Sequence, residues 1–363
     1  MDTKQLGRCP APSLPENTAE RSEFVRLRAG ATVRALAMKG GATLATVFPT
    51  TPIFLTSDSS FNDYRPTMDP SGTMVIFERT PTPDDGSPTT LQVMDVSNPD
   101  PSPFLSGPAP ASQTRPDWCW ATDKPDVLFN GASSNNSKKS PVSVYLVGNK
   151  GANPTLISGT TGAYYPKWNL DGTLFVTEND GGTPSPCNTI FTLGGVAQTA
   201  NIDGVDMNNV SMFGGMPAVM STDLPQIAYA GQPKLANWNG PNTPIKYSEN
   251  YNYIFLNTPK GTSFVSSPLE SDASILSFDP QYEGRAPDIS PDGTMIVFES
   301  NRPKGAANYS IYLYSLKNKS ITQVTVSTLN CQHAKFFPCG TKLILGAQKP
   351  TWHIGWVDIS SLL

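Results

Sequence analysis

The chain has 363 residues, of which 38% are hydrophobic and 15% charged, and it contains 35 proline and 29 glycine residues. This mixture favours many short strands joined by turns over long helices. The formal net charge is −4, and lysines and arginines are scattered along the chain, so the basic patch typical of nucleic-acid-binding proteins is absent.

The N-terminal region begins with a proline-rich stretch, and we expect residues 1–35 to form a flexible extension. It lacks the apolar core of a signal peptide, and Lys39, Pro49 and Pro52 interrupt the most apolar early stretch, so we expect no membrane insertion. Low charge with many Asn, Ser, Thr and Pro residues is typical of exported proteins. We therefore expect a periplasmic or secreted protein whose leader is absent from this chain, with a cytoplasmic location as the alternative.

A repeated motif begins near residue 61, in which a strand, a polar turn and a second apolar strand follow one another. Three copies match one another most closely, at residues 65–78, 165–178 and 287–299, and share a proline, a Gly-Thr pair and a final glutamate. Three weaker copies are at residues 115–129, 216–229 and 334–345. A period of roughly 40 to 50 residues is typical of β-propellers, in which each repeat forms one blade.

Each strong copy closes its turn with a glycine, Gly72, Gly172 or Gly293, because glycine readily takes the positive φ of a tight hairpin. A third apolar strand and a short edge strand then complete a blade. A four-stranded twisted blade cannot cover its own apolar faces, so neighbouring blades must stack. The sequence predicts an all-β fold, a six-bladed β-propeller of four-stranded antiparallel blades.

We predict that residues 36–363 form this single propeller. Its blades are expected to begin near residues 61, 112, 161, 212, 282 and 330. The turns of successive repeats are about one blade apart in the chain, except that the interval before Gly293 is longer. The extra length indicates an insertion at about residues 231–253. The last blade ends near Leu363, and we expect a strand from before the first repeat, at residues 53–56, to complete it and close the ring.

The best copy, Ile289-Ser-Pro-Asp-Gly-Thr-Met-Ile-Val-Phe-Glu-Ser-Asn-Arg302 followed by Ile311-Tyr-Leu-Tyr314, resembles the repeat of TolB-type propellers. The resemblance covers about residues 53–363 and implies a central funnel, used as a protein-binding platform or as the body of an enzyme. TolB carries an additional N-terminal α/β domain, for which the residues before the first repeat are too few. The prolyl-oligopeptidase relatives carry an α/β-hydrolase domain, and the chain has no Gly-x-Ser-x-Gly elbow.

Propellers bind ligands at the funnel mouth, where the first strand of each blade begins and the second strand ends. The candidate ligand-binding residues at this level are Asp63, Arg65, Glu78, Arg115, Tyr164, Tyr165, Glu178, Glu283, Arg285, Glu299, Gln332 and His333. Arginine forks recognise carboxylates and tyrosine rings stack on sugars, which favours an anionic or sugar-like ligand. The alternative is that Arg65 with Glu78, and Arg285 with Glu299, only satisfy one another inside their blades.

No cofactor is evident in the sequence. Gln332, His333, Gln348 and His353 are similar in type to the metal ligands of oligogalacturonate lyases, which are propeller enzymes, but two histidines are too few for such a site. We therefore predict no metal centre, and we expect His353 to be a strand residue of the final blade. Turns such as Asp292-Gly293 offer oxygen ligands for calcium, although ordinary β-turn chemistry is the preferred interpretation.

Five cysteines without zinc-type spacing mean that at least one thiol is free or pairs outside the chain. A disulfide between Cys331 and Cys339 is one alternative.

The repeats account for most of the sequence, and no Ser-His-Asp set is recognisable around its only two histidines, His333 and His353. We therefore predict a monomeric, non-catalytic binding propeller that recognises a protein partner or a carbohydrate-like ligand. A protein partner is expected to contact the insertion loop through Trp238, Tyr247 and Tyr251. The alternative is a carbohydrate lyase or hydrolase, with His333 or a carboxylate as general base and an arginine stabilising the developing negative charge.

Overall fold

The computed structural model describes residues 48–82, 87–121, 126–133, 141–169, 171–179, 187–198, 201–202, 205–206, 215–219, 227–231, 253–258, 261–264, 283–302 and 307–363. The predicted extension at residues 1–35 lies outside these ranges. So does nearly all of the predicted insertion, including Trp238, Tyr247 and Tyr251.

The described strands form six four-stranded antiparallel sheets, and each sheet contains one copy of the repeat. The first strands are β2 (Phe61–Met68), β6 (Ser112–Trp118), β10 (Ala163–Trp168), β16 (Gly215–Val219), β20 (Gly284–Ile289) and β24 (Asn330–Phe336). The second strands are β3 (Met74–Pro81), β7 (Val127–Ala132), β11 (Leu174–Asn179), β17 (Ile227–Gly231), β21 (Met295–Ser300) and β25 (Lys342–Gln348). We number the sheets one to six in this order.

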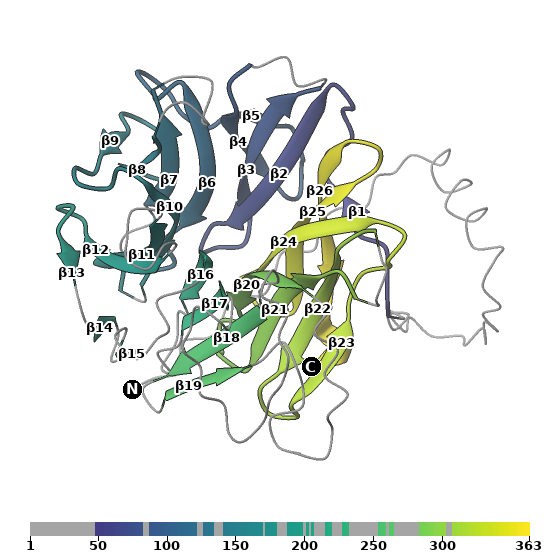
Figure 1. The fold of residues 1–363 in the computed structure, drawn as a ribbon. Helices are drawn as coiled ribbons and strands as arrows, with labels where there is room; N and C mark the ends of the chain where they lie inside the picture. The colour runs from purple at the N-terminus through teal and green to yellow at the C-terminus, as the bar shows by residue number, and fades with distance from the viewer. Residues whose placement is uncertain are drawn as a thin grey trace, which may run out of the picture.

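The third and fourth strands complete each sheet toward the outside of the molecule (Figure 1). The third strands are β4 (Thr90–Asp95), β8 (Ser143–Val147), β12 (Cys187–Thr192), β18 (Tyr253–Thr258), β22 (Ser310–Ser315) and β26 (Trp352–Asp358). The fourth strands are β5 (Ser102–Pro103), β9 (Thr155–Leu156), β13 (Ala197–Gln198), β19 (Gly261–Phe264), β23 (Ser320–Gln323) and, in sheet six, β1 (Ile53–Phe54).

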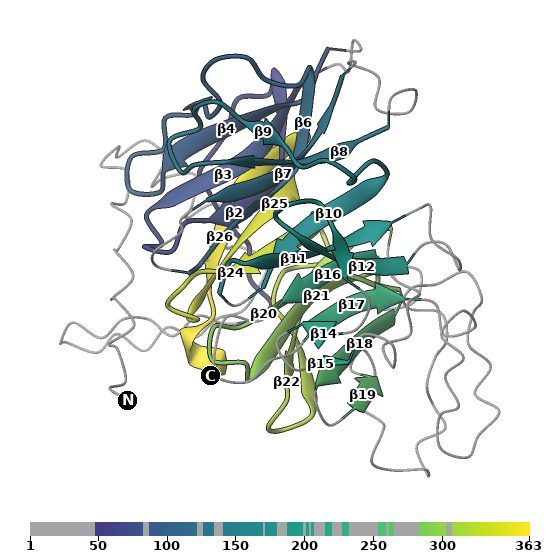
Figure 2. The ribbon, with the colours of Figure 1, turned by 90° about the vertical axis from the view of Figure 1, so that its left-hand side faces the viewer.

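The first strands contact one another around a closed ring. β2 contacts β6, β6 contacts β10, and the series continues through β16, β20 and β24, which contacts β2 again. Figures 1 and 2 show the sheets fanning out from this ring of first strands. The ring encloses a central channel, so side chains from six distant parts of the sequence can meet on one axis.

Hydrophobic cores lie between neighbouring sheets. Ile76 of sheet one packs with Trp118 and Phe129 of sheet two, and all three side chains are buried. The same arrangement joins sheets five and six, where Val297 packs in one cluster with Phe336. Because each sheet buries both faces against its neighbours, the short strands are stable only within the ring.

The strand expected at residues 53–56 is present as β1, which pairs antiparallel with β26. Leu55 N also donates to Ile354 O, and Ile354 N donates to Thr56 Oγ1. The N-terminal strand is thus joined to the C-terminal sheet, which ends in the short 3₁₀-helix η1 (Ser360–Leu362).

The structure adds features that the sequence patterns did not predict. A two-stranded sheet, β14 (Asn201–Ile202) with β15 (Val205–Asp206), lies between sheets three and four in the chain.

The alternative of a Cys331–Cys339 disulfide is wrong, because Cys331 is a free thiol buried in the core while Cys339 is disulfide-bonded. Within the described ranges, no helix is long and apolar enough to cross a membrane.

Candidate functional site

Every first strand carries a bulge at the same point. The register with the second strand shifts just after Tyr64, Thr114, Tyr164, Gly215, Arg285 and Gln332. In five of the sheets a non-glycine residue at the bulge has a φ between 45° and 53°: Arg65, Arg115, Tyr165, Ala286 and His333. This uncommon left-handed backbone recurs around the channel, and we call these five residues the bulge layer.

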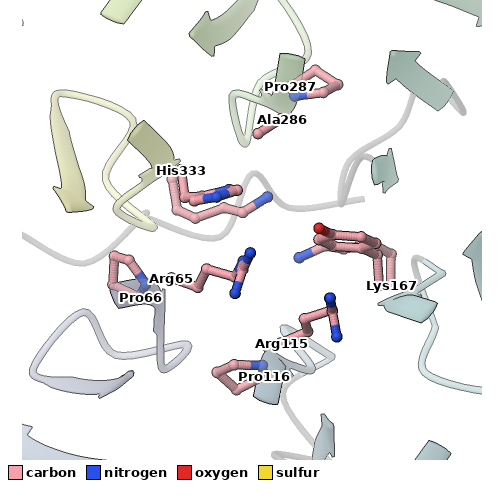
Figure 3. A pocket seen from close by; sticks show the side chains of 10 residues that line it. Arg65, Pro66, Arg115, Pro116, Lys167, Ala286, Pro287 and His333 are labelled. Atoms are coloured by element: carbon pink, nitrogen blue, oxygen red, sulfur yellow. The ribbon is translucent and has the colours of Figure 1, made fainter. Parts of the chain in front are cut away.

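The bulge layer opens on a cavity of about 40 Å³ in the channel (Figure 3). Its lining is Arg65, Pro66, Arg115, Pro116, Tyr165, Lys167, Ala286, Pro287, His333 and Lys335. In Figure 3 the ends of Arg65, Arg115 and Lys167 point toward one open space. Four of the ten lining residues have cationic side chains, two arginines and two lysines, and none is acidic.

Glu78 on β3 connects sheets one and two behind this cavity. Its Oε2 accepts a hydrogen bond from Arg65 Nη1 at 2.9 Å, and its Oε1 accepts from the backbone N of Arg115 at 2.6 Å. The carboxylate is buried, at 4% exposure. Burial is the largest single effect on the pKa of Arg65 and lowers it, but Glu78, Tyr165 and Tyr64 together outweigh burial, and the pKa of Arg65 is raised. Glu78 therefore holds both arginines in place without facing the ligand space.

Glu299 on β21 repeats this connection between sheets five and six. Its Oε1 accepts a hydrogen bond from Arg285 Nε at 2.9 Å and forms an ion pair with Arg285 Nη2 at 2.7 Å, and its Oε2 accepts a hydrogen bond from His333 N at 2.8 Å. The guanidinium of Arg285 lies 4.0 Å from the centre of the Tyr309 ring, whose hydroxyl donates to Glu283. Arg285 is thus engaged at the rim and does not line the cavity.

Arg115 differs from the other cations of the cavity. Its Nη1 donates to Thr114 Oγ1 at 3.2 Å, its Nε is buried without an acceptor, and no carboxylate among the described residues forms an ion pair with it. Its guanidinium lies 4.5 Å from the centre of the Tyr165 ring and 5.3 Å from that of Tyr164. Cation–π contacts position this side chain but do not neutralise it, so Arg115 keeps a positive charge and open donors beside the cavity.

Two residues beyond the bulge, the first strands contribute a second set of charges. Lys167 Nζ donates to Asp117 Oδ1 at 2.6 Å, and Lys335 Nζ donates to Asp288 Oδ1 at 3.0 Å. The other oxygen of each aspartate accepts a backbone N–H of the next sheet, from Trp168 and Phe336 respectively. We call Lys167 and Lys335 the lysine layer. The ammonium groups reach the cavity, while their aspartates do not line it.

His333 lies among these cations, with its ring edge-on to Tyr64 at 4.7 Å between centres. Burial, and then the charges of Arg65 and Arg285, hold the pKa of His333 well below its usual range. The imidazole is therefore neutral at pH 7. A neutral imidazole can accept a proton or a hydrogen bond from a ligand in the cavity.

This pKa shift predicts a pH-dependent stability. Below about pH 6.5 the unfolded chain binds a proton at His333, whereas the folded protein does not. The free energy of unfolding is therefore highest above this pH and decreases as the pH falls below it. We expect His333→Asn, which suits a left-handed backbone, to reduce the fall in unfolding free energy between pH 7 and pH 5 by up to about 2 kcal/mol. Urea denaturation at each pH measures this, and equal falls in both proteins would contradict it.

The predicted site residues divide into those that line the cavity, those that hold the lining side chains in place, and those that lie elsewhere. Arg65, Arg115, Tyr165 and His333 line the cavity, while Glu78 and Glu299 hold its side chains from behind. Both ion pairs considered in the sequence, Arg65 with Glu78 and Arg285 with Glu299, are formed.

The remaining predicted residues lie elsewhere: Asp63, Tyr164, Glu178, Glu283, Arg285 and Gln332 do not line the cavity. Asp63 is fully buried and is held by Arg79 through Nε and Nη2. Gln332 accepts a hydrogen bond from Tyr64, and Glu178 is paired with Tyr164 across β10 and β11.

Sequence reasoning missed Lys167 and Lys335. Their signal is present in the repeat, because each stands two residues after the bulge residue, where sheets two and five have Asp117 and Asp288. At this position of the repeat, some sheets carry an aspartate and the sheets that follow them carry a lysine. Such alternation indicates that the side chains of neighbouring sheets form ion pairs around the channel.

Two of the side chains considered as metal or calcium ligands, His353 and Asp292, have hydrogen-bond partners close to them in the chain. His353 lies on β26 as expected, and its Nε2 is 3.1 Å from Thr351 Oγ1. The Asp292 carboxylate accepts hydrogen bonds from Ser290 and Thr294 within its own turn. Among the residues with described positions, no group of three or more His, Cys, Asp or Glu side chains is arranged to hold a metal ion.

Comparisons with known proteins agree with this architecture. No family model and no curated protein sequence matches the chain. Among solved structures, a TolB-like protein of Agrobacterium tumefaciens matches with a TM-score of 0.51 and 13% identity over 82% of this chain and 90% of that one. The chain is a β-propeller. Its blades are the four-stranded antiparallel sheets described above.

Two enzymes have the same fold as this propeller. Oligogalacturonate lyase of Vibrio parahaemolyticus matches with a TM-score of 0.51 and 12% identity, over 84% of this chain and 92% of that one. The GH93 α-L-arabinofuranosidase of Fusarium graminearum matches with a TM-score of 0.50 and 12% identity, over 86% and 98%. At such identities the likeness concerns the fold, and the function of the propeller must be argued from its own site.

Proposed function

We propose that the protein is a binding propeller that holds the anionic, carboxylate-bearing part of a ligand in its central cavity. The observation that carries this proposal is the lining of the cavity, which has four cationic side chains and no acidic one. Guanidinium groups match the geometry of a carboxylate, and a partly buried cavity strengthens the attraction.

The charges behind the cavity support the same proposal. Glu78, Asp117 and Asp288 each pair with one lining cation, which leaves Arg115 without a carboxylate partner among the described residues. An anionic group beside Arg115 would compensate this charge and accept its open donors. A buried charged donor without an acceptor typically costs about 1–3 kcal/mol, so supplying the acceptor favours binding.

The size of the cavity limits what enters it. A volume of about 40 Å³ holds roughly three water-sized groups, enough for a carboxylate but not for a sugar ring. The rest of a carbohydrate-like ligand or of a protein partner therefore stays outside, at the rim formed by tyrosines such as Tyr164 and Tyr309. Every cavity residue comes from one chain, so a monomer suffices for binding.

Substitution of Arg115 tests this proposal. We expect D-galacturonate to bind the wild-type protein in isothermal titration calorimetry and neutral D-galactose to bind at least ten-fold more weakly. Arg115→Ala should weaken galacturonate binding by at least about ten-fold, because charge-assisted hydrogen bonds contribute about 1.5–3 kcal/mol. Lys150→Ala, which removes one positive charge from an exposed turn, is the matched control and should bind like wild type. Equal binding by all three proteins would contradict the proposal.

A second candidate function is catalysis on an anionic carbohydrate, as a lyase or hydrolase. The neutral His333 favours it, because a general base must be unprotonated at the working pH and Arg65 beside it can stabilise negative charge. Chain cleavage of polygalacturonate, measured by new reducing ends, should then occur with wild type and be lost in His333→Asn. If the wild-type protein binds polygalacturonate without cleaving it, the catalytic function is contradicted and the binding function is retained.

We also propose an extracytoplasmic location. The disulfide bond of Cys339 supports it, because disulfides persist in oxidising compartments.

A further inference from the structure

Lys167 has the surroundings of a nucleophilic amine. Its Nζ donates to Asp117 Oδ1 at 2.6 Å, and Asp117 Oδ2 accepts the backbone N–H of Trp168 at 3.0 Å. A nucleophile within hydrogen-bond reach of a base, with the base oriented by a third group, is the arrangement that activates weak nucleophiles. Asp117 is therefore placed to take a proton from Nζ.

A second amine lies beside Lys167. The side chains of Lys167 and Lys335 are within hydrogen-bond reach of each other, and both line the cavity. Burial lowers the pKa of Lys167, Asp117 opposes this effect, and the charge of Lys335 adds to the lowering. The pKa of Lys335 is instead raised, because Asp288 and Asp117 together outweigh burial, the largest single effect. Of the two amines, Lys167 therefore gives up its proton more readily, and the neutral amine is the form that attacks a carbonyl carbon.

Arg115 supplies an anchor for a carboxylate next to this amine. Its strand β6 contacts β10, and its guanidinium lies 4.5 Å from the ring centre of Tyr165, two residues before Lys167 on β10. The Nε of Arg115 is buried without an acceptor. The cavity of about 40 Å³ holds roughly three water-sized groups, and Figure 3 shows the ends of Arg115 and Lys167 directed into it. In so small a space, a carboxylate bound by Arg115 has its adjoining carbon close to the amines of the lining.

We propose that Lys167 forms an imine with a small 2-oxo acid whose carboxylate is bound by Arg115. This inference rests on the proposed function and names its ligand class. The cavity favours glyoxylate, the smallest 2-oxo acid, because loss of the carbonyl oxygen leaves only the carboxylate and one carbon in the available space.

The covalent step needs no further reactant. Nζ attacks the carbonyl carbon and a nitrogen–carbon bond forms, while the bond from that carbon to its oxygen breaks. The oxygen leaves as water with two protons that Nζ carried as an ammonium group. The protonated imine keeps its positive charge beside Asp117, and the carboxylate compensates the charge of Arg115.

Reductive trapping of the full chain with glyoxylate and sodium cyanoborohydride tests the proposal, because reduction turns the imine into a stable carboxymethyl amine. Peptide mass mapping then gives the rate of modification at each lysine. We expect Lys167 to react at least about ten-fold faster than the exposed Lys150, because Arg115 holds the carbonyl group beside Nζ. Burial alone would make Lys167 the slower of the two, and in the urea-unfolded chain the two rates should be equal.

Two changes test the role of the carboxylate. Arg115→Ala should slow the modification of Lys167 at least about ten-fold and leave that of Lys150 unchanged, because it removes a charge-assisted hydrogen bond. Acetaldehyde has the same two carbons and no carboxylate, and its preference for Lys167 over Lys150 should be at least about ten-fold smaller than that of glyoxylate. An unchanged rate at Lys167 in Arg115→Ala would overturn the 2-oxo acid class.

Calorimetric titration with glycolate separates this inference from the proposed function, because glycolate has the carboxylate and no carbonyl group. Glycolate binding that is lost in Arg115→Ala, without preferred modification of Lys167, would overturn the imine and leave the anion site. Preferred modification of Lys335 would overturn the assignment of the nucleophile. Absence of both glycolate binding and preferred modification would overturn both proposals.

Discussion

Replacing Glu299 with alanine is expected to destabilise the protein by about 3–5 kcal/mol, because a buried ion pair loses one partner. Glu299 is 1% exposed, accepts hydrogen bonds from Arg285 Nε and from the backbone N of His333, and forms an ion pair with Arg285 Nη2. Without the carboxylate, a largely buried guanidinium and a buried N–H of the next sheet lose their acceptor. The substitution therefore weakens both sheet five and its contact with sheet six.

Urea denaturation measures this effect as a lower midpoint with an unchanged slope. Glu299→Gln keeps an oxygen for His333 N and should fall between wild type and alanine. Asp100→Ala removes an exposed carboxylate and should change stability by less than about 0.5 kcal/mol. A loss in Glu299→Ala no larger than in this control would mean that the ion pair contributes little to holding the two sheets.

Asp117→Ala is the second substitution with a large expected effect, a loss of about 3 kcal/mol or more. Asp117 binds Lys167 Nζ through one oxygen and Trp168 N through the other. The two side chains are 15% and 12% exposed, so the ammonium group would remain in the channel with little access to water. Burial already lowers the pKa of Lys167, and removal of Asp117 would lower it further.

A double variant separates the charge from the structural contact. Asp117→Ala with Lys167→Met removes both charges and should recover a large part of the loss, because no buried charge then lacks a partner. The N–H of Trp168 stays unpaired in both variants, so recovery should be incomplete. A double variant as unstable as Asp117→Ala would show that the lost contact to Trp168, and not the charge of Lys167, dominates.

The sequence predicts the strands well because each repeat carries its own local signals. Apolar runs such as Val127-Leu-Phe129 specify a strand buried on both faces, and in the three strong copies the glycine of the turn specifies where the second strand begins. Gly72, Gly172 and Gly293 all have the positive φ that the turn requires, between 67° and 72°. The paired ends Arg65 with Glu78 and Arg285 with Glu299 follow from this hairpin geometry.

The cavity was only partly predictable, and Arg285 shows why. Arg65 stands at the bulge of its strand, whereas in sheet five the bulge residue is Ala286 and Arg285 precedes it. A shift of one residue sends a side chain in another direction, so Arg65 enters the cavity while Arg285 lies against Tyr309 at the rim. Two arginines that look equivalent in the sequence therefore have different surroundings.

By itself the sequence determined the repeat, the four-strand unit and the turns, because these depend on residues close together in the chain. The tertiary structure alone decided that Lys167 and Lys335 share one cavity with Arg65 and Arg115, and that Asp117 and Asp288 hold the two lysines from behind. The physical reason is ring closure: side chains from distant repeats meet only when the six first strands surround one channel. Their charges then depend on neighbours in space and not on neighbours in sequence.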